Sequence, residues 1–314
     1  MLAAVIHAAF PVFALILTGW LCARFKLLNA LSMEGLNKFV IYLALPAQLF
    51  DAMSHVKLTE LAQPGFYWAF SLGMLITAGL HRLLTSNSTT PKTDSIIQCM
   101  TSAYSNAGFM GIPLCLIVFG KAGLSPAIIT TLFTVSFLFA LTILWIELTR
   151  LEHGKVGPAL SKVCLALVKN PLLISPILGI TWSASGLSMP GAIDRYINLL
   201  GEAATPCALV AIGLFLAANP MRGFDRSVMR IVLLKIAVQP LLTAFLVFYV
   251  FSMPLMWAQI AILSAALPVG TGPFMMAQIY QRDASASARA ILISTICSVI
   301  TISFILAWIT QTLT

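Results

Sequence analysis

The chain has 314 residues, of which 60% are apolar and only 9% are charged. Soluble domains carry roughly 25% charged residues, so this composition excludes a water-soluble globular protein and indicates a chain whose solvent is the lipid bilayer. The net charge of +8 does not indicate nucleic-acid binding, because the basic residues fall in short loops between apolar stretches and form no basic face.

Ten apolar stretches are predicted to be membrane-spanning helices, because a helix needs about 20 apolar residues to cross the hydrocarbon core of a bilayer. Polar and charged turns separate the stretches, as at 26–29, 85–92 and 220–226. Residues 1–23 contain no Lys or Arg, so the first stretch is predicted to be a retained span and not a cleaved signal peptide. In chain order, the predicted spans are 4–23, 36–55, 66–84, 96–119, 124–147, 171–187, 196–217, 227–251, 255–280 and 287–311.

The distribution of basic residues orients these spans in the membrane. Of the 18 Lys and Arg residues, fourteen fall in loops that follow odd-numbered spans and three in loops that follow even-numbered spans. Short cytoplasmic loops are enriched in Lys and Arg, so the loops after odd-numbered spans are predicted to be cytoplasmic. The protein is therefore predicted to be a multi-pass protein of the cell inner membrane with both termini periplasmic.

Prolines and glycines recur at an offset of 160 residues, which indicates a tandem repeat. Each half holds five predicted spans, an odd number, so the second half has the opposite polarity and the halves are related by a two-fold axis in the membrane plane. The predicted fold is an all-α membrane protein of ten transmembrane helices, with one inverted five-helix repeat at 1–149, a cytoplasmic linker at 150–170 and the second repeat at 171–314. The recurring pairs are Pro11 and Pro171, Pro46 and Pro206, Pro113 and Pro273, and Gly19 and Gly179.

The predicted linker carries apolar residues at helical spacing. Two interpretations stay open, a helix that lies on the inner membrane surface and a helix that packs on the protein. The residues of this apolar face are Leu160, Val163, Cys164, Leu167 and Val168.

The fourth and ninth predicted spans are interrupted near their centres by glycine and proline. Residues 105–113 read Ser-Asn-Ala-Gly-Phe-Met-Gly-Ile-Pro, and residues 266–273 read Ala-Leu-Pro-Val-Gly-Thr-Gly-Pro. Proline removes a backbone N–H and glycine leaves helical geometry cheaply, so we expect breaks at Gly108–Pro113 and Pro268–Pro273. Unpaired backbone groups cost several kcal/mol each against lipid, so the breaks must face protein or water. Breaks at corresponding places of two halves are typical of the binding site of a secondary transporter.

The second half of each interrupted span is predicted to begin near Pro113 and near Pro273, with its N-terminus at mid-membrane. Each helix N-terminus carries roughly half a positive charge, so two of them favour an anionic ligand. Asn106, placed at the end of the first half-helix, offers hydrogen-bond donors and an acceptor to a ligand; the alternative is a bond between helices. The candidate substrate-binding residues are Asn106, Gly108, Gly111, Pro113, Pro268, Gly270, Thr271, Gly272 and Pro273.

Glu202 and Lys235 are ionisable residues inside predicted spans. A buried charge costs about 2.5–3.5 kcal/mol on insertion scales, so Glu202 is a candidate for proton coupling; the alternative, which we favour, is a hydrated position near the outer interface. Lys235 lies about two turns into the eighth span from the cytoplasm and is predicted to extend its ammonium group to the inner surface. Asp51, at the outer end of the second span, is predicted to be solvated.

The chain lacks the residue patterns of an enzyme, a metal site or an ATP-driven pump. Its six cysteines form no CxxC pair, and its four histidines show no paired-ligand spacing. No GxxxxGK[ST] loop is present, and no nucleophile–base pair or pair of carboxylates falls at mid-membrane depth. We therefore expect no catalytic residue, no metal and no cofactor.

Four segments resemble motifs of the auxin efflux carrier family, which includes the plant PIN-type carriers and bacterial organic-acid permeases. Residues 106–114, Asn-Ala-Gly-Phe-Met-Gly-Ile-Pro-Leu, are similar to the family's fourth-span motif of an Asn followed by Met-Gly-Ile-Pro. Residues 266–274, Ala-Leu-Pro-Val-Gly-Thr-Gly-Pro-Phe, are similar to its ninth-span motif. Residues 37–46 and 211–217 match further family patterns, and the resemblance runs from the first span to the last.

The resemblance implies that the fourth and ninth spans cross at their breaks. It also implies a scaffold of spans one, two, six and seven, often dimeric, and a moving transport unit of spans three to five and eight to ten. The family's binding role would fall on Asn106 and on Pro268, Gly270 and Pro273. The long cytoplasmic loop of the plant carriers is absent, so a small carboxylate such as malonate or malate fits better than auxin.

The predicted function is secondary transport of small organic anions, mono- or dicarboxylates, by alternating access. The expected partners are the carboxylate, the lipid bilayer and a second copy bound through the scaffold helices, with no nucleic acid. One alternative is a sodium- or proton-coupled symporter or antiporter of the bile-acid transporter type, which would favour acidic residues at the crossing; none occurs at 101–116 or 264–277. Another is a non-transporting membrane sensor, although no soluble sensor domain is present.

Overall fold

The computed structural model describes residues 2–86, 90–150, 157–219 and 225–313, and these residues form helices and turns without a β-strand. The predicted turns at 85–92 and 220–226 and the linker at 150–170 are described only in part, because 87–89, 220–224 and 151–156 fall outside these ranges. The helices of the first part are α1 (Leu2–Arg24), α2 (Ala30–Phe39), α3 (Leu45–Ser54), α4 (Pro64–Leu84), α5 (Lys92–Ala103), α6 (Ile112–Phe119), α7 (Leu124–Leu132), α8 (Phe139–Arg150) and α9 (Gly157–Val168). They are followed by α10 (Pro171–Ser185), α11 (Gly191–Glu202), α12 (Ala204–Ala218), α13 (Arg226–Leu233), α14 (Gln239–Phe245), α15 (Leu255–Ala266), α16 (Gly272–Ile279) and α17 (Ser285–Leu313).

Short segments of tighter or wider helix connect several of these elements. The 3₁₀ turns are η2 (Leu58–Leu61) and η4 (Gly120–Gly123). The π-helical turns are η1 (Val40–Ala44), η3 (Ala107–Gly111), η5 (Phe133–Leu138), η6 (Leu234–Val238) and η7 (Leu246–Val250).

Three prolines follow π-helical turns directly. Pro46, Pro113 and Pro240 are each the second residue of the helix after η1, η3 and η6, respectively. In a π turn an N–H reaches the carbonyl five residues back, as the amide of Ile112 reaches Ala107, and this change of register lets the helix pass a residue that has no N–H. The prediction that Pro113 breaks the fourth span is therefore wrong, because η3 carries the chain through it in helical form.

Side-chain caps and a glycine define several helix ends. The Asn170 side chain accepts a hydrogen bond from the amide of Leu172 at 3.0 Å, and the Asp225 side chain accepts one from the amide of Ser227 at 2.9 Å. Gly186 ends α10 in the left-handed conformation, with φ of 69°.

Several described helical stretches have the length and apolar composition of membrane spans. Four are long enough to cross a bilayer by these two criteria: Ala107–Thr149, Gly191–Ala218, Arg226–Val250 and Ser285–Gln311. Shorter apolar helical stretches run over Phe10–Arg24, Pro171–Ser185 and Leu255–Ala266. The described chain is thus all-helical and has the properties of a membrane protein.

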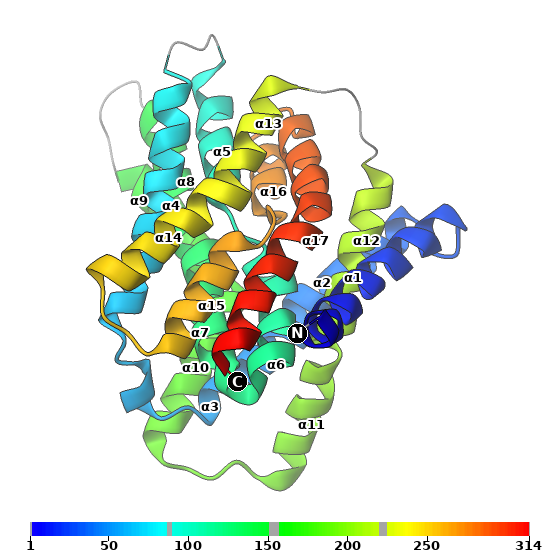
Figure 1. The fold of residues 1–314 in the computed structure, drawn as a ribbon, viewed down its shortest axis with the longest axis vertical. Coiled ribbons are helices and arrows are strands. Elements are labelled where there is room, and N and C mark those ends of the chain that lie inside the picture. Colours follow the sequence, from blue (N-terminus) through cyan, green and yellow to red (C-terminus); the bar gives the residue numbers. More distant parts are fainter. Residues whose placement is uncertain (1, 87–89, 151–156, 220–224, 314) are drawn as a thin grey trace.

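The helices form two groups that meet along the middle of the molecule. In one group α1 packs on α12, α2 on α12, and α3 on α10 and α11. In the other, α4 packs on α5, α14 and α15, and α5 packs on α8. Figure 1 shows α1, α2 and α12 on one side and α4, α5, α13 and α14 on the other. Contacts of α12 with η3, of α1 with α6 and α17, and of α3 with α7 join the two groups.

Glycines permit two of these helix pairs to touch through their backbones. A Cβ added at Gly213 of α12 would lie 2.0 Å from the carbonyl oxygen of Ile16 in α1, and one at Gly19 would lie 2.1 Å from that of Val210. At Gly179 of α10, the added Cβ would lie 2.6 Å from a carbonyl oxygen of α3. Small residues at helix crossings allow the close packing that holds helices together in lipid.

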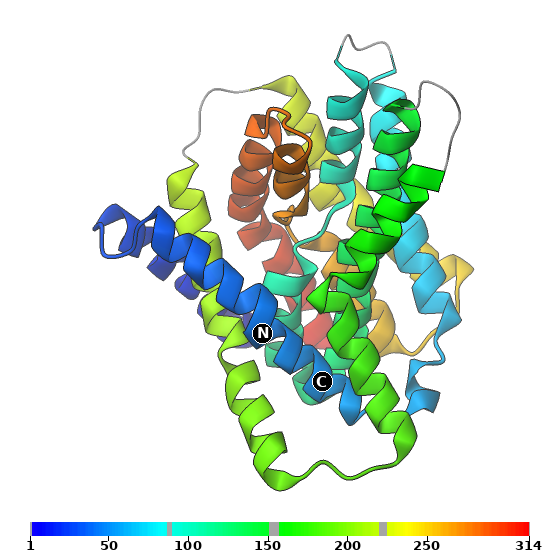
Figure 2. The same ribbon diagram turned by 180° about the vertical axis from the view of Figure 1, so that it is seen from behind.

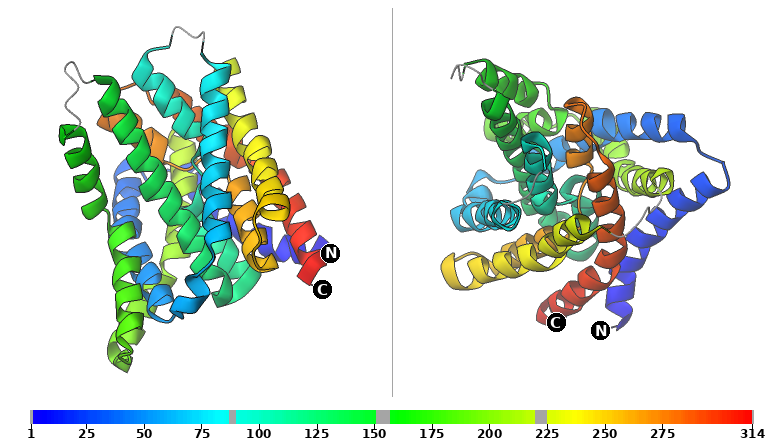
Figure 3. Two further views of the ribbon diagram at one scale, coloured as in Figure 1. Left: turned by 90° about the vertical axis from the view of Figure 1, so that its left-hand side faces the viewer. Right: turned by 90° about the horizontal axis from the view of Figure 1, so that it is seen from above.

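The helix α9 of the predicted linker packs on α8 with one face. Val163 is buried in the same cluster as Ile143 and Ile146, whereas Leu160 and Val168 are exposed. The predicted apolar face of this helix is thus only partly packed on the protein, since Cys164 is exposed as well, and both interpretations stay open. Figure 2 follows α9 into α10, and Figure 3 shows α1 and α17, the first and last helices, side by side.

Candidate functional site

The two interrupted spans lose helical geometry at the centre of the molecule. The first helix, α5, ends at Ala103, and helical structure resumes with η3, so the break is 104–106. The second, α15, ends at Ala266 and α16 begins at Gly272, so that break is 267–271. The first break comes earlier than the predicted Gly108–Pro113, which lies within the second half-helix because of the π turn before Pro113.

Asn106 lies at the end of the break that adjoins the second half-helix, and not at the end of the first half-helix as predicted. It immediately precedes η3, so it belongs to the start of the second half-helix and not to the end of the first. Its side chain makes no capping hydrogen bond to η3, and the residue is 6% exposed. An amide group at the N-terminal end of a helix can bond a ligand that also faces the helix N–H groups.

The two breaks hydrogen-bond to each other. Ser105 and Val269 form an isolated antiparallel bridge. The amide of Asn106 donates to the carbonyl of Pro268 at 2.9 Å, and the amide of Gly270 donates to the carbonyl of Tyr104 at 3.0 Å. These bonds pair backbone groups that the breaks remove from their helices, which is the condition for irregular backbone at membrane depth.

The crossing is closely packed around three of the candidate glycines. A Cβ added at Gly272 would lie 2.3 Å from Cζ of Tyr104, and one at Gly270 would lie 3.0 Å from the same ring. A Cβ at Gly111 would lie 2.8 Å from Cδ1 of Leu267. These glycines therefore permit the close approach of the two interrupted segments, whether or not they also contact a ligand.

A cavity of about 240 Å³ lies against the crossing. Of the nine candidate residues, Asn106, Gly108, Thr271 and Gly272 line it. The other five candidates do not line it and are buried in or beside the crossing: Gly111, Pro113, Pro268, Gly270 and Pro273.

Several lining residues escaped the sequence analysis. Ser105 is 1% exposed, and its Oγ has no hydrogen-bond partner among the described residues. Tyr104 from the first break, and Lys169 and Asn170 from the end of the linker, are further polar residues of the lining. A serine inside an apolar span usually bonds to its own helix, and Lys169 reaches the cavity only through the tertiary fold, so neither carried a local signal.

The carbonyl ends of both first half-helices are capped by side chains of one neighbouring helix. Lys235 Nζ donates to the carbonyl of Ala265 at 2.5 Å, and Gln239 Nε2 donates to the carbonyl of Ala103 at 3.3 Å. Lys235 is 0% exposed, so the prediction that its ammonium group reaches the inner surface is wrong. Its partner lies 30 residues away in the chain, and no local pattern could have revealed it.

Glu202 lies apart from the crossing cavity. It is the last residue of α11, is exposed, and lines a separate cavity of about 410 Å³ together with Gln48 and Thr205. This position agrees with the hydrated alternative for Glu202. Asp51 was predicted to be solvated. It is partly buried and lines the same cavity.

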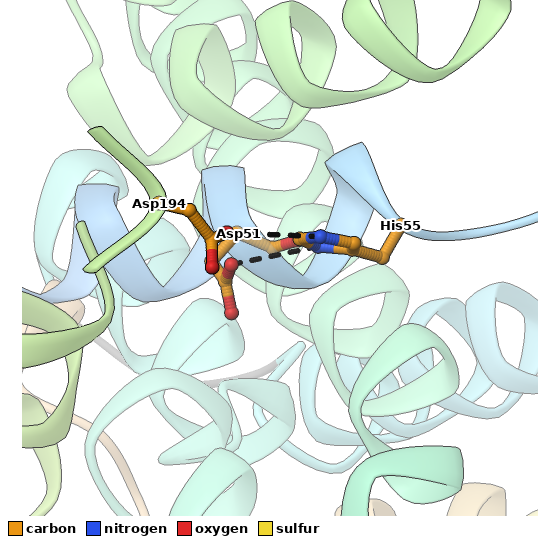
Figure 4. A group of neighbouring side chains, drawn as sticks. All are labelled: Asp51, His55 and Asp194. Atoms are coloured by element: carbon orange, nitrogen blue, oxygen red, sulfur yellow. Dashed lines mark hydrogen bonds and ion pairs between the residues drawn. The ribbon is translucent and has the colours of Figure 1, made fainter. Parts of the chain in front are cut away.

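Asp51 also belongs to a cluster with His55 and Asp194, drawn in Figure 4. His55 Nδ1 lies 3.5 Å from Asp51 Oδ1, and His55 Nε2 lies 3.8 Å from Asp194 Oδ1. One potential ligand atom from each residue lies within 4.8 Å of the others, and the three side chains join α3 to α11. Among the described residues, these three side chains form the group whose spacing suits a metal ion. They line a different cavity from the one at the crossing.

Comparison with known proteins places the chain in one family. The family model described as membrane transport protein matches residues 4–306. A "putative malonate transporter" of Rhizobium meliloti is 29% identical over 306 residues, which are 94% of this chain and 93% of that protein. An uncharacterised transporter of Methanocaldococcus jannaschii is 26% identical over 308 residues, 93% of this chain and 94% of that protein.

Plant auxin carriers match a shorter part of the chain. Auxin efflux carrier component 1 of Arabidopsis thaliana is 29% identical over 132 residues, 40% of this chain and 21% of that protein. The resemblance to the auxin efflux carrier family is thus confirmed. The chain belongs to the membrane transport protein family, whose model covers it almost from end to end.

Proposed function

We propose that this protein is a secondary transporter of small organic anions, mono- or dicarboxylates such as malonate or malate, and that it binds them at the crossing of the two interrupted helices. The observation that carries the proposal is the convergence, on one cavity, of two helix N-terminal ends with Asn106 and the unpartnered hydroxyl of Ser105.

The charge distribution around the cavity favours an anion. The N-terminal ends of η3 and α16 face the crossing, and each contributes roughly half a positive charge. Lys169 adds a full positive charge to the lining, and none of the described lining residues is acidic. A carboxylate there would meet backbone N–H groups, an amide and a hydroxyl, which together replace much of its hydration.

The cavity size favours a small substrate. Sites for drug-sized ligands measure about 300–1,000 Å³. The crossing cavity, at about 240 Å³, suits a smaller molecule. The printed name of the Rhizobium relative, a "putative malonate transporter", supports a short dicarboxylate.

The proposed architecture is ten membrane spans in two inverted repeats, at 1–149 and 171–314, joined by the linker 150–170. Helix packing supports it: α1 lies on α12 and α10 lies on α3, as expected if the first and second spans correspond to the sixth and seventh. Gly19 and Gly179, which are 160 residues apart, both sit at backbone contacts of these pairs.

The proposed mechanism is alternating access of the elevator type. Spans one, two, six and seven would form a scaffold, and spans three to five and eight to ten would carry the site across the membrane. The two helix groups described above correspond to these units and support the division. We further propose an inner-membrane protein with periplasmic termini that forms a homodimer through its scaffold helices, with Glu202 as a candidate for coupling.

A thermal-shift screen of the purified protein tests the proposal. We expect malonate, malate or a related carboxylate to raise Tm in a saturable way, because a ligand that binds only the folded state stabilises it by mass action. Malonamide, which has the same shape without the charges, should leave Tm unchanged, as should chloride at equal ionic strength. Stabilisation by malonamide and malonate alike would contradict recognition of an anion.

A further inference from the structure

We propose that Lys235 is a built-in cation, whose ammonium group caps the carbonyl end of α15 at the crossing, a place that a cation-coupled carrier would fill with a metal ion. On this proposal the ammonium group balances the negative helix ends at the crossing, so no bound sodium or potassium ion is needed there. Its consequence for transport rests on the proposed function, whereas its structural part does not.

The first step is the contact of Lys235 with the end of α15. The carbonyl of Ala265 lies in the last turn of α15, where carbonyls have no helical donor. The amide of Val269, four residues later, donates instead to Oγ of Ser294 at 3.0 Å. The carbonyl of Ala265 instead accepts a hydrogen bond from Lys235 Nζ at 2.5 Å, and Lys235 is fully buried.

The second step is the matching contact at the end of α5. Gln239 lies one helical turn after Lys235 and is also 0% exposed. Its Nε2 donates to the carbonyl of Ala103, the last residue of α5, at 3.3 Å. One face of the η6–α14 segment therefore caps both helix ends, and the bridge between Ser105 and Val269 keeps these ends together.

The third step is the charge balance. Each helix C-terminus carries roughly half a negative charge, so the two ends together offset about one positive charge. No Asp or Glu occurs at 95–146, 226–282 or 285–314, the sequence that forms most of the elements around η6. At the edges of these segments, Asp94 pairs with Arg282 at 2.5 Å and Asp225 with Arg289 at 3.4 Å. A positive charge on Lys235 would thus be opposed by helix ends and not by a carboxylate.

The fourth step is what a tethered cation does. Carbonyl groups at the ends of interrupted helices also coordinate Na⁺ in secondary transporters, and an ion held there can bind and leave with the substrate. An ammonium group on a four-carbon stem cannot leave. Lys235 does not line the crossing cavity, so it acts on a bound anion across the crossing, as a positioning residue.

Thermal stability without substrate tests the structural part. In the wild type, Tm should be the same in sodium chloride and in choline chloride. Lys235→Ala removes the ammonium group and leaves the carbonyl of Ala265 without this donor, so Tm of the variant should fall in choline and recover by about 2 °C or more in sodium. Lys121→Ala, which removes an exposed lysine far from the crossing, should show neither effect. Sodium stabilisation of the wild type equal to that of Lys235→Ala would overturn the proposal.

Malonate binding to Lys235→Gln and Lys235→Arg tests the role of the charge. Gln keeps a hydrogen-bond donor without the charge, so malonate affinity should fall about 5-fold or more, and the conservative Arg variant should retain more of it. Lys235→Gln also decides the question if Lys235→Ala fails to fold in both salts. Wild-type affinity and Tm for Lys235→Gln would show that the charge has no role. Loss of malonate binding by the wild type itself would count against the proposed function and leave the sodium comparison standing.

Discussion

Asn106 is the residue on which the site depends most. Its side chain could be identified from the sequence, because a polar residue beside glycine and proline inside an apolar span is expensive unless it is used. Its position could not, because the π turn after it determines which half-helix it joins. Ser105 and Lys169 were missed for a related reason: their contact with the cavity exists only after distant segments pack together.

We expect Asn106→Ala to weaken binding of a dicarboxylate about 10- to 150-fold, because a hydrogen bond to a charged group contributes roughly 1.5–3 kcal/mol. Isothermal titration calorimetry with malonate measures this loss of affinity. Asn219→Ala is the matched control, because the Asn219 side chain donates to its own helix at Phe215, 2.9 Å away, and does not line the cavity. Equal affinities for the wild type and a folded Asn106→Ala would place the ligand elsewhere.

Glu202→Gln should leave malonate affinity within about 2-fold of the wild type, because Glu202 is exposed and lines a cavity that shares no residue with the crossing cavity. The pH dependence of uptake is where an effect would appear if Glu202 couples transport to protons. Malonate affinity and uptake measured at several pH values separate a role in substrate binding from a role in proton coupling. A large loss of affinity at every pH would mean that Glu202 contacts the substrate.

At the scale of elements, apolar length was a better guide than proline. The apolar stretches could be predicted because crossing a bilayer imposes a length on each helix. The divisions within them were harder, because prolines that follow a π turn leave the helix intact at Pro46, Pro113 and Pro240. The two spans leave helical geometry at 104–106, which holds no proline, and at 267–271, which holds Pro268. Hydrogen bonds between the two breaks stabilise the extended backbone.

We expect Gly272→Ala to destabilise the protein by about 1–3 kcal/mol and to weaken substrate binding, because overpacking forces a shift of the backbone. The new methyl group would lie 2.3 Å from Cζ of Tyr104. Gly79→Ala, in α4, is the control, since a methyl group there would meet nothing within 4 Å and Gly79 does not line the cavity. Thermal melts and malonate titration of both variants measure the difference. If the two variants behave alike, the crossing is looser than described.

At the scale of the whole molecule, the sequence offered an offset and a charge pattern. The offset of 160 residues matches glycines that sit at backbone contacts in both halves, Gly19 against α12 and Gly179 against α3. The pairing of α1 with α12 and of α3 with α10 could not be read from the chain, because it depends on which apolar faces fit one another. Membership of the membrane transport protein family indicates transport, and the substrate is determined by experiment.

Reporter fusions at the two chain ends test the membrane orientation. We expect periplasmic signals from both, because fourteen basic residues fall in loops after odd-numbered spans and three in the others. The contact of α1 with α17 agrees with ends on one side, although Met1 and Thr314 themselves fall outside the described residues. A cytoplasmic signal at one end only would exclude an even number of spans and with it the two five-helix repeats.

Counterflow of labelled malonate into proteoliposomes preloaded with unlabelled malonate tests the central claim most directly, because exchange requires no knowledge of the driving ion. The account predicts exchange by the wild type that excess malate inhibits and malonamide does not. It also predicts less than about a tenth of that rate for Asn106→Asp, which keeps the shape of Asn106 and places a negative charge beside the anion. Wild-type exchange by a folded Asn106→Asp, or the absence of carboxylate exchange by the wild type, would contradict an anion site at the crossing.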